Sequence, residues 1–153
     1  MNDQSTAEYL SSHEFFFGLN EDLLQFLCEC AIKKGQILFQ QGENADKFYI
    51  VRSGRISIQM PAIIGPDLEI QKLGKDQVLG WSWLIPPFKW TFQAMPEEDS
   101  ELLMFDGATI LERCEKEPRF GYELLKKFAA LMSMRLDAAR QKMMGEWNPA
   151  GFA

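Results

Sequence analysis

The chain has 153 residues, of which 46% are hydrophobic and 25% charged, and its formal net charge is −6. These values predict one globular domain, residues 1–153, that is long enough to bury a core without disulfides or a structural metal. Because the net charge is negative, no basic surface is expected that would bind a phosphate backbone, so no direct nucleic-acid partner is expected. No apolar run approaches the roughly 18 residues of a membrane span, and the polar N-terminus is unlike a secretory signal, so we expect a cytoplasmic protein without a membrane partner.

The first 33 residues are expected to hold an arm and one helix. Residues 1–12 are polar and are expected to form a flexible arm. From Glu21 to Ala31 apolar residues recur at three-to-four spacing, and Asn20 can cap the first turn, so residues 20–33 are predicted to be a helix. In that helix Cys28 and Cys30 would point about 200° apart and could not share an ion, which favours buried structural thiols.

The middle of the chain, residues 36–106, is predicted to be a β-roll. Short runs of β-branched and aromatic residues alternate with turns about eight to ten residues apart, and glycines at 35, 42 and 54 mark several of these turns. We count six to eight strands between Gln36 and Asp106. The fold class is therefore mainly β with flanking helices (α+β): an antiparallel roll or jelly roll of about eight strands.

Helical patterns return in residues 107–147. The segment ATILERCEKE predicts a short helix that ends at Pro118, and a long helix follows from about Phe120 to Trp147, leaving residues 148–153 as a frayed tail. The apolar residues of the long helix cover a wider part of its surface than the single stripe needed to pack on one sheet. They predict a homodimer through this helix, and the alternative is a monomer in which all of them pack on the sheet and the short helix. The candidate interface residues are Phe128, Met132, Leu136, Ala139 and Met143.

Residues suited to catalysis or metal binding are few. His13 is the only histidine, which excludes metal sites built from several histidines and histidine-dependent hydrolysis. Asp99, Glu101 and Asp106 lie in polar turn positions without a nucleophile, a base partner or a phosphate-binding loop, so they are interpreted as solvated carboxylates. We therefore expect neither an enzyme nor a metal site.

The order of elements and one specific segment carry a family resemblance. The segment KKGQILFQQGENADKFYIVRSGRISI resembles the glycine-punctuated strands of the cyclic-nucleotide-binding domain found in catabolite-activator and Fnr-type regulators and in cyclic-nucleotide-dependent kinases. The resemblance covers nearly the whole chain. It implies a helix, an eight-stranded roll, a short helix and a long helix, with a regulatory function and dimerisation through the long helix.

The segment VLGWSWLIPPFKWTFQA falls where this family carries its phosphate-binding cassette. The family uses a glutamate there for the ribose hydroxyl and an arginine for the cyclic phosphate. Gly80 matches the cassette glycine and Thr91 its threonine, but Trp81 stands at the glutamate and Phe88 at the arginine. Lys89 is a candidate for a displaced cation. The sequence therefore argues against cyclic AMP or cyclic GMP in the usual mode.

On the long helix, the segment MSMRLDAARQK resembles the part of the family that caps the nucleotide base. Arg135 is kept, whereas Ala139 replaces a base-contacting hydroxyl and Arg140 follows it.

The tryptophan cluster has two interpretations. In the favoured one, Trp81, Trp83 and Trp90 pack the mouth of the roll as core residues. In the other, an altered pocket holds a different small anion through Ser82, cassette amides and Lys89 or Arg135, with an indole stacked on it. The candidate ligand-binding residues are Gly80, Trp81, Ser82, Phe88, Lys89, Trp90, Thr91, Arg135 and Arg140.

The leading functional hypothesis is a non-catalytic regulatory or sensor domain. The sequence assigns it no certain cofactor, and a small anionic ligand is the candidate only under the second interpretation of the tryptophans. The alternatives are a ligand-free dimeric protein-interaction module and a catabolite-activator/Fnr-like regulator of transcription that acts through a protein partner.

Overall fold

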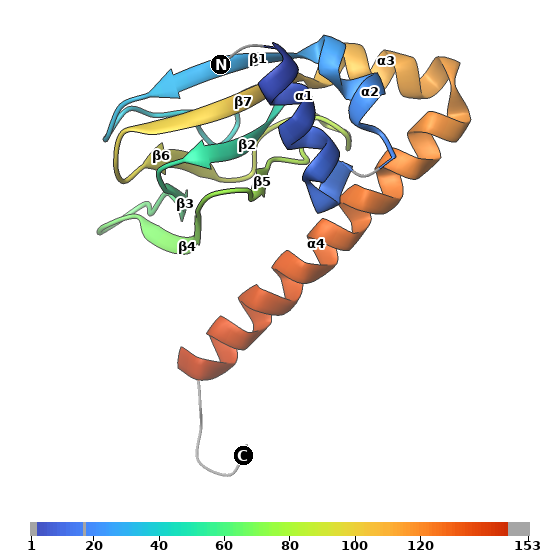
Figure 1. Cartoon of the computed structure of the whole chain (residues 1–153). Helices are drawn as coiled ribbons and strands as arrows, with labels where there is room; N and C mark the ends of the chain where they lie inside the picture. Colours follow the sequence, from blue (N-terminus) through green and yellow to red (C-terminus); the bar gives the residue numbers. More distant parts are fainter. Residues whose placement is uncertain (1–2, 17, 147–153) are drawn as a thin grey trace.

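The structure is a computed structural model that describes residues 3–16 and 18–146. Within these residues, two antiparallel sheets face each other as a roll, and helices lie outside it (Figure 1). The strands are β1 (Leu27–Ile32), β2 (Lys47–Ser53), β3 (Ile56–Met60), β4 (Leu68–Leu73), β5 (Val78–Leu79), β6 (Gln93–Pro96) and β7 (Ser100–Asp106). One sheet has the order β1-β7-β2-β5 and the other β4-β3-β6. The expectation of a mainly β roll with flanking helices is confirmed, with β2–β7 between Gln36 and Asp106.

The strand β2 is buried on both faces, which explains its unbroken apolar run. Phe48, Ile50 and Val51 are all fully buried although neighbours on a strand point to opposite faces. Phe48 stacks on Phe105 of β7 on the side that faces the helices, whereas Tyr49 packs against Phe39 on the side that faces the other sheet. A central strand covered on both sides cannot show the simple alternation of a half-exposed strand.

The turn after β2 depends on Gly54. Its φ of 95° lies in the left-handed region, and a Cβ built on it would stand 2.1 Å from Ser100 Oγ. Glycine is therefore required both by the backbone conformation and by the close approach of β7.

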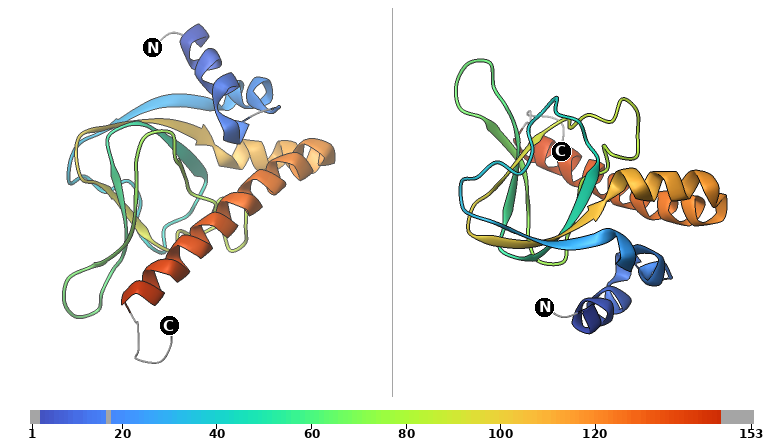
Figure 2. Two further views of the ribbon diagram at one scale, coloured as in Figure 1. Left: turned by 60° about the horizontal axis from the view of Figure 1, so that its bottom comes forward. Right: turned by 90° about the horizontal axis from the view of Figure 1, so that it is seen from above.

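The N-terminal segment is helical, and the expectation of a flexible arm is wrong for residues 3–12. Helix α1 spans Asp3–Ser12, and Leu10 in its last turn is fully buried. The Tyr9 hydroxyl donates a hydrogen bond to the Asp76 carboxylate, and the Arg52 guanidinium carbon lies 3.7 Å from the centre of the Tyr9 ring. These contacts hold α1 on the body of the domain, where both views of Figure 2 place it beside the roll.

The predicted helix over residues 20–33 is also wrong beyond its first turns. After the short 3-10 turn η1 (Glu14–Phe16), α2 covers only Asn20–Leu23 and the 3-10 turn η2 covers Leu24–Phe26, and the chain then enters β1. β1 pairs with β7 along its whole length, from Leu27 opposite Phe105 to Ile32 opposite Ser100. The ladder of hydrogen bonds to a distant strand outweighs the local helical periodicity.

The strand assignment changes the interpretation of the two neighbouring cysteines. Cys28 and Cys30 are two apart on a strand, so both side chains lie on the same face. Cys28 is exposed and Cys30 half-buried, so the expectation of buried structural thiols is wrong for Cys28.

The C-terminal helices are α3 (Gly107–Lys116) and α4 (Pro118–Glu146), as predicted. The Asp106 carboxylate accepts a hydrogen bond from the Thr109 amide at 3.2 Å and caps α3, and α4 then runs diagonally past the roll (Figure 1). The predicted frayed tail, residues 148–153, lies outside the described residues. Among the described helices, none has the length and apolar character needed to cross a membrane.

Candidate functional site: a cavity between the roll and helix α4

The candidate site is a half-open cavity of about 370 Å³ bounded by the roll, by the segment that follows β5 and by helix α4. We call residues 80–91 the cassette segment. The residues that line the cavity are Phe39, Ile58, Ile70, Gln71 and Leu79 from the roll; Gly80, Trp81, Ser82, Trp90 and Thr91 from the cassette segment, with Phe92 beyond it; and Met132, Arg135, Leu136 and Ala139 from α4. The wall is therefore mainly apolar and aromatic, with a few polar groups.

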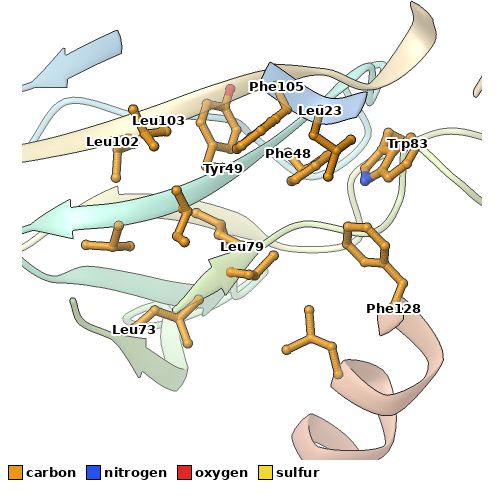
Figure 3. Packing of buried hydrophobic residues seen from close by; sticks show 14 of the residues in the cluster. Leu23, Phe48, Tyr49, Leu73, Leu79, Trp83, Leu102, Leu103, Phe105 and Phe128 are labelled. Atoms are coloured by element: carbon orange, nitrogen blue, oxygen red, sulfur yellow. The ribbon is translucent and has the colours of Figure 1, made fainter. Parts of the chain in front are cut away.

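Trp83 belongs to the core and not to the cavity. It is 1% exposed, stacks on Phe48 and meets Phe128 of α4 edge-on, as Figure 3 illustrates. Its indole Nε1 donates a hydrogen bond to the Gly80 carbonyl oxygen at 3.2 Å, so the ring is satisfied where it is buried. For Trp83 the core interpretation of the tryptophans holds.

Trp90 serves both the core and the cavity. Its ring stacks on Phe39 with centroids 3.7 Å apart and planes within 8°, and both rings line the cavity. Gly80 makes room for this arrangement, because a Cβ there would lie 2.8 Å from the Trp90 ring and the Gly80 φ is 103°. Trp81 is half-buried and lines the same cavity.

The tip of the cassette segment turns away from the cavity. Phe88 and Lys89 are exposed and are absent from the described lining. The Phe88 carbonyl oxygen accepts a hydrogen bond from the Ala45 amide at 2.7 Å, and Lys89 Nζ donates to Asn44 Oδ1 at 2.7 Å. Both residues are thus engaged with the loop before β2, and Lys89 is not positioned as a substitute for a phosphate-binding arginine.

Arg135 is the charged group of the cavity. Among the described lining residues none is acidic, and Arg135 alone is charged. Its Nη2 donates a hydrogen bond to the Val78 carbonyl oxygen, and burial lowers the pKa of its guanidinium to about 10 because the charged form loses hydration. Arg140, the other arginine predicted for the site, is exposed and lies outside the described lining.

The structure thus brings together six of the predicted ligand-binding residues: Gly80, Trp81, Ser82, Trp90, Thr91 and Arg135. It leaves out Phe88, Lys89 and Arg140. The residues that the sequence analysis missed come chiefly from the strands and from the loop around Phe39. Among the missed residues, Gln71 could have been noticed in the sequence, since it is a polar residue inside the strand LEIQKL. The direction of its side chain, however, depends on how β4 pairs with β3.

Four of the five predicted interface residues contribute to the cavity or to the core. Met132, Leu136 and Ala139 line the cavity from α4. Phe128 is fully buried against Phe48 and Trp83, so its assignment to a dimer interface is wrong. Leu136 and Met143 remain 62% and 59% exposed.

A β-roll with a loop segment and a long C-terminal helix beside a cavity is the fold that the sequence resemblance implies. Comparison with family models makes the assignment specific: residues 29–117 match the cyclic nucleotide-binding domain, and the chain belongs to this family. No curated protein sequence matches the chain significantly.

Solved structures of other proteins share this fold. A protein from Geobacter metallireducens GS-15 assigned to the cyclic nucleotide-binding proteins has a TM-score of 0.77 at 21% identity, covering 86% of this chain and 98% of its own. A cyclic nucleotide-binding domain from Methylobacillus flagellatus KT has a TM-score of 0.76 at 14% identity over 94% of this chain and 83% of its own. The sensor domain of the transcriptional regulator DNR from Pseudomonas aeruginosa has a TM-score of 0.71 at 21% identity, over 88% and 93%.

Proposed function

We propose that this chain is a regulatory, non-enzymatic domain whose cavity does not take cyclic AMP or cyclic GMP as its ligand. The observation that carries the proposal is the composition of the described cavity lining, which contains no carboxylate and only one cation, Arg135. The family's mode of recognition, as the sequence resemblance implies it, needs a carboxylate for the ribose and a cassette guanidinium for the phosphate. Trp81 and Phe88 occupy those two sequence positions.

The missing contacts are large on the scale of binding energies. A hydrogen bond or ion pair to a charged group in a partly closed site contributes about 1.5–3 kcal/mol. Loss of both would weaken affinity by a factor of roughly hundreds to tens of thousands. The aromatic lining adds to this, because the Phe39–Trp90 stack and Trp81 surround the space with apolar surface that does not replace the hydration of a ribose and a phosphate.

Isothermal titration calorimetry with cyclic AMP and cyclic GMP tests the proposal. We expect no saturable heat for either nucleotide at concentrations up to about 1 mM. A dissociation constant in the low micromolar range or below for either nucleotide would refute the proposal. Lys89→Ala is the matched variant: because Lys89 bonds to Asn44 outside the described lining, we expect it to behave as wild type in every titration.

We also infer that the domain acts as a homodimer through α4. Support comes from a row of apolar side chains on this helix that the single chain leaves in solvent, including Leu125 (48% exposed), Leu136 and Met143. With Met132 and Ala139 they recur at helical spacing and form one continuous stripe along α4. A contiguous exposed apolar stripe on a regulatory domain is typical of a surface that a partner covers.

A ligand-independent protein-interaction module is the second candidate function. It is favoured by the turn between β3 and β4, where Ile63 and Ile64 are almost completely exposed and Leu68 follows at 60%. Native mass spectrometry of the purified protein distinguishes the two candidates. A co-purifying small molecule supports the regulatory domain with a ligand. A dimer without any bound small molecule supports the interaction module.

A further inference from the structure

Arg135 is placed where a cation has little to interact with inside the protein. It projects from α4 into the wall of an apolar cavity, and the Val78 carbonyl oxygen is its hydrogen-bond partner. Among the described residues no carboxylate forms an ion pair with it, although Arg113, Lys72 and Lys126 each have one. A guanidinium carries five N–H donors, so most of its hydrogen-bonding capacity is left for another group.

Arg135 is half-buried and has one neutral hydrogen-bond partner, and proteins usually pair a charge that has lost part of its hydration with an opposite charge. The Arg135 side chain sits against the cavity, so an anion that enters the cavity would supply the missing partner. The planar fork of a guanidinium matches a carboxylate in a bidentate geometry better than it matches any neutral acceptor.

The rest of the cavity lining indicates the chemistry of the uncharged part of the ligand. Phe39 and Trp90, which stack on each other and are 7% and 6% exposed, are the aromatic part of the lining from the roll side, and the half-buried Trp81 adds a second indole. Ile58, Ile70 and Leu79 contribute aliphatic surface, whereas Ser82 offers only a neutral hydroxyl. At about 370 Å³ the cavity falls in the range of sites for small organic ligands, and such a lining favours a planar apolar body.

We propose that the cavity binds a compact aromatic carboxylate, with the carboxylate paired to Arg135 and the apolar body packed between Trp81 and the Phe39–Trp90 stack. This inference rests on the proposed function, in which cyclic nucleotides are not the ligand. A cyclic nucleotide has its charge on a phosphodiester next to a polar sugar, whereas the cavity offers one cation and otherwise mainly apolar surface.

The test uses 2-naphthoate as the probe and 2-naphthalenemethanol as its neutral counterpart. Because Trp81 and Trp90 line the cavity, binding is followed by quenching of tryptophan fluorescence and confirmed by calorimetry. We expect saturable binding of 2-naphthoate to the wild-type protein, and binding of the alcohol at least about tenfold weaker, the difference a single charge-assisted pair produces.

Variants of Arg135 separate the ion pair from general hydrophobic binding. Arg135→Gln should weaken 2-naphthoate at least about tenfold and remove the preference for the acid over the alcohol. Arg135→Lys keeps the charge and should retain part of that preference, which guards against a folding defect in the glutamine variant. Arg140→Gln removes an exposed arginine outside the described lining and should leave binding unchanged.

Equal affinity for the acid and the alcohol, or equal loss of both in Arg135→Gln, would overturn the role of the charge. No binding of 2-naphthoate to a folded wild-type protein that also ignores cyclic AMP would overturn the ligand class while leaving the proposed function intact. A low-micromolar dissociation constant for cyclic AMP would instead overturn the proposed function itself.

Discussion

Gly80 meets two structural demands at one position. Its φ of 103° lies in a region that residues with a Cβ rarely adopt, and the Trp90 ring leaves no room for a Cβ there. The same residue accepts the Trp83 indole hydrogen bond through its carbonyl oxygen. The start of the cassette segment is therefore held by two indoles, one in the core and one on the cavity.

Gly80→Ala is expected to destabilise the protein by about 1–3 kcal/mol, because a Cβ would be strained by the backbone and would clash with Trp90 at 2.8 Å. Urea unfolding followed by tryptophan fluorescence measures the change. The control is Gly74→Ala, where a Cβ would meet no atom within 4 Å, and which should stay within about 0.5 kcal/mol of wild type. An equal effect of the two substitutions would contradict the packing argument.

Helix α4 presents three surfaces with different tasks. Leu124, Phe128 and Leu131 are buried on the body of the domain, while Arg135 and Met132 line the cavity. The apolar stripe overlaps the cavity surface, because Met132, Leu136 and Ala139 belong to both, and its exposed large side chains are Leu125, Leu136 and Met143. Contacts within one chain therefore bury part of the apolar surface of this helix, as the monomer alternative requires. The exposed side chains of the stripe are the part that a second copy would cover.

Leu136→Glu is expected to convert a homodimer into a monomer, because it would place a charge in the apolar stripe that the partner covers. Sedimentation of the protein at tens of micromolar measures the change. Leu125→Glu lies on the same stripe but outside the described cavity lining and should act alike, whereas Met134→Glu, 70% exposed on another side of the helix, should remain dimeric. A wild-type protein that is monomeric at this concentration would defeat the dimer proposal.

At the scale of the whole molecule, one aromatic cluster joins the layers. Phe128 of α4 meets Phe48 of β2 and Trp83 of the cassette segment, with ring centroids 5.2 and 5.3 Å apart (Figure 3). It also meets Phe15 of the N-terminal segment, with ring centroids 5.0 Å apart. Phe105 of β7 stacks on Phe48 and extends the cluster into the sheet. Helices, sheet and cassette segment therefore share one core, and we expect them to unfold together.

Phe128→Ala is expected to cost about 3–5 kcal/mol, the usual range for deleting a buried aromatic ring. Urea unfolding measured by far-UV circular dichroism and by tryptophan fluorescence should give coincident transitions in the wild type, both displaced to lower urea in the variant. Tyr122→Ala removes a ring of the same helix that is 57% exposed and should change stability far less. Separate transitions by the two probes in the wild type would argue against one shared core.

Local sequence patterns predicted the secondary structure correctly where the hydrophobic period and the turn residues were unambiguous. The strands from β2 to β7 were predictable because apolar runs alternate with turns that need glycine at positions such as Gly42 and Gly54. Helix α4 was predictable because a long uninterrupted helical period has no competing strand interpretation. The altered cassette was visible because Trp81 and Phe88 are read directly from the chain.

The errors fall where a distant partner decides the outcome. Residues 27–32 carry a helical period too short to distinguish from a strand, and their pairing with β7 made them β1. Residues 3–12 looked like an arm because their polar composition hides the contacts of Leu10 and Tyr9 with the body of the domain.

The sequence by itself determined the roll and the long helix, since these follow from residue order and local backbone preference, and it carried the resemblance that puts Trp81 and Phe88 at the positions of the family's carboxylate and arginine. Only the tertiary structure decided which tryptophans are core and which face the cavity, that Phe128 is buried, and that Arg135 lies in the cavity while Lys89 bonds to Asn44. Direction and burial of a side chain depend on packing against residues far away in the chain, and no local pattern encodes them.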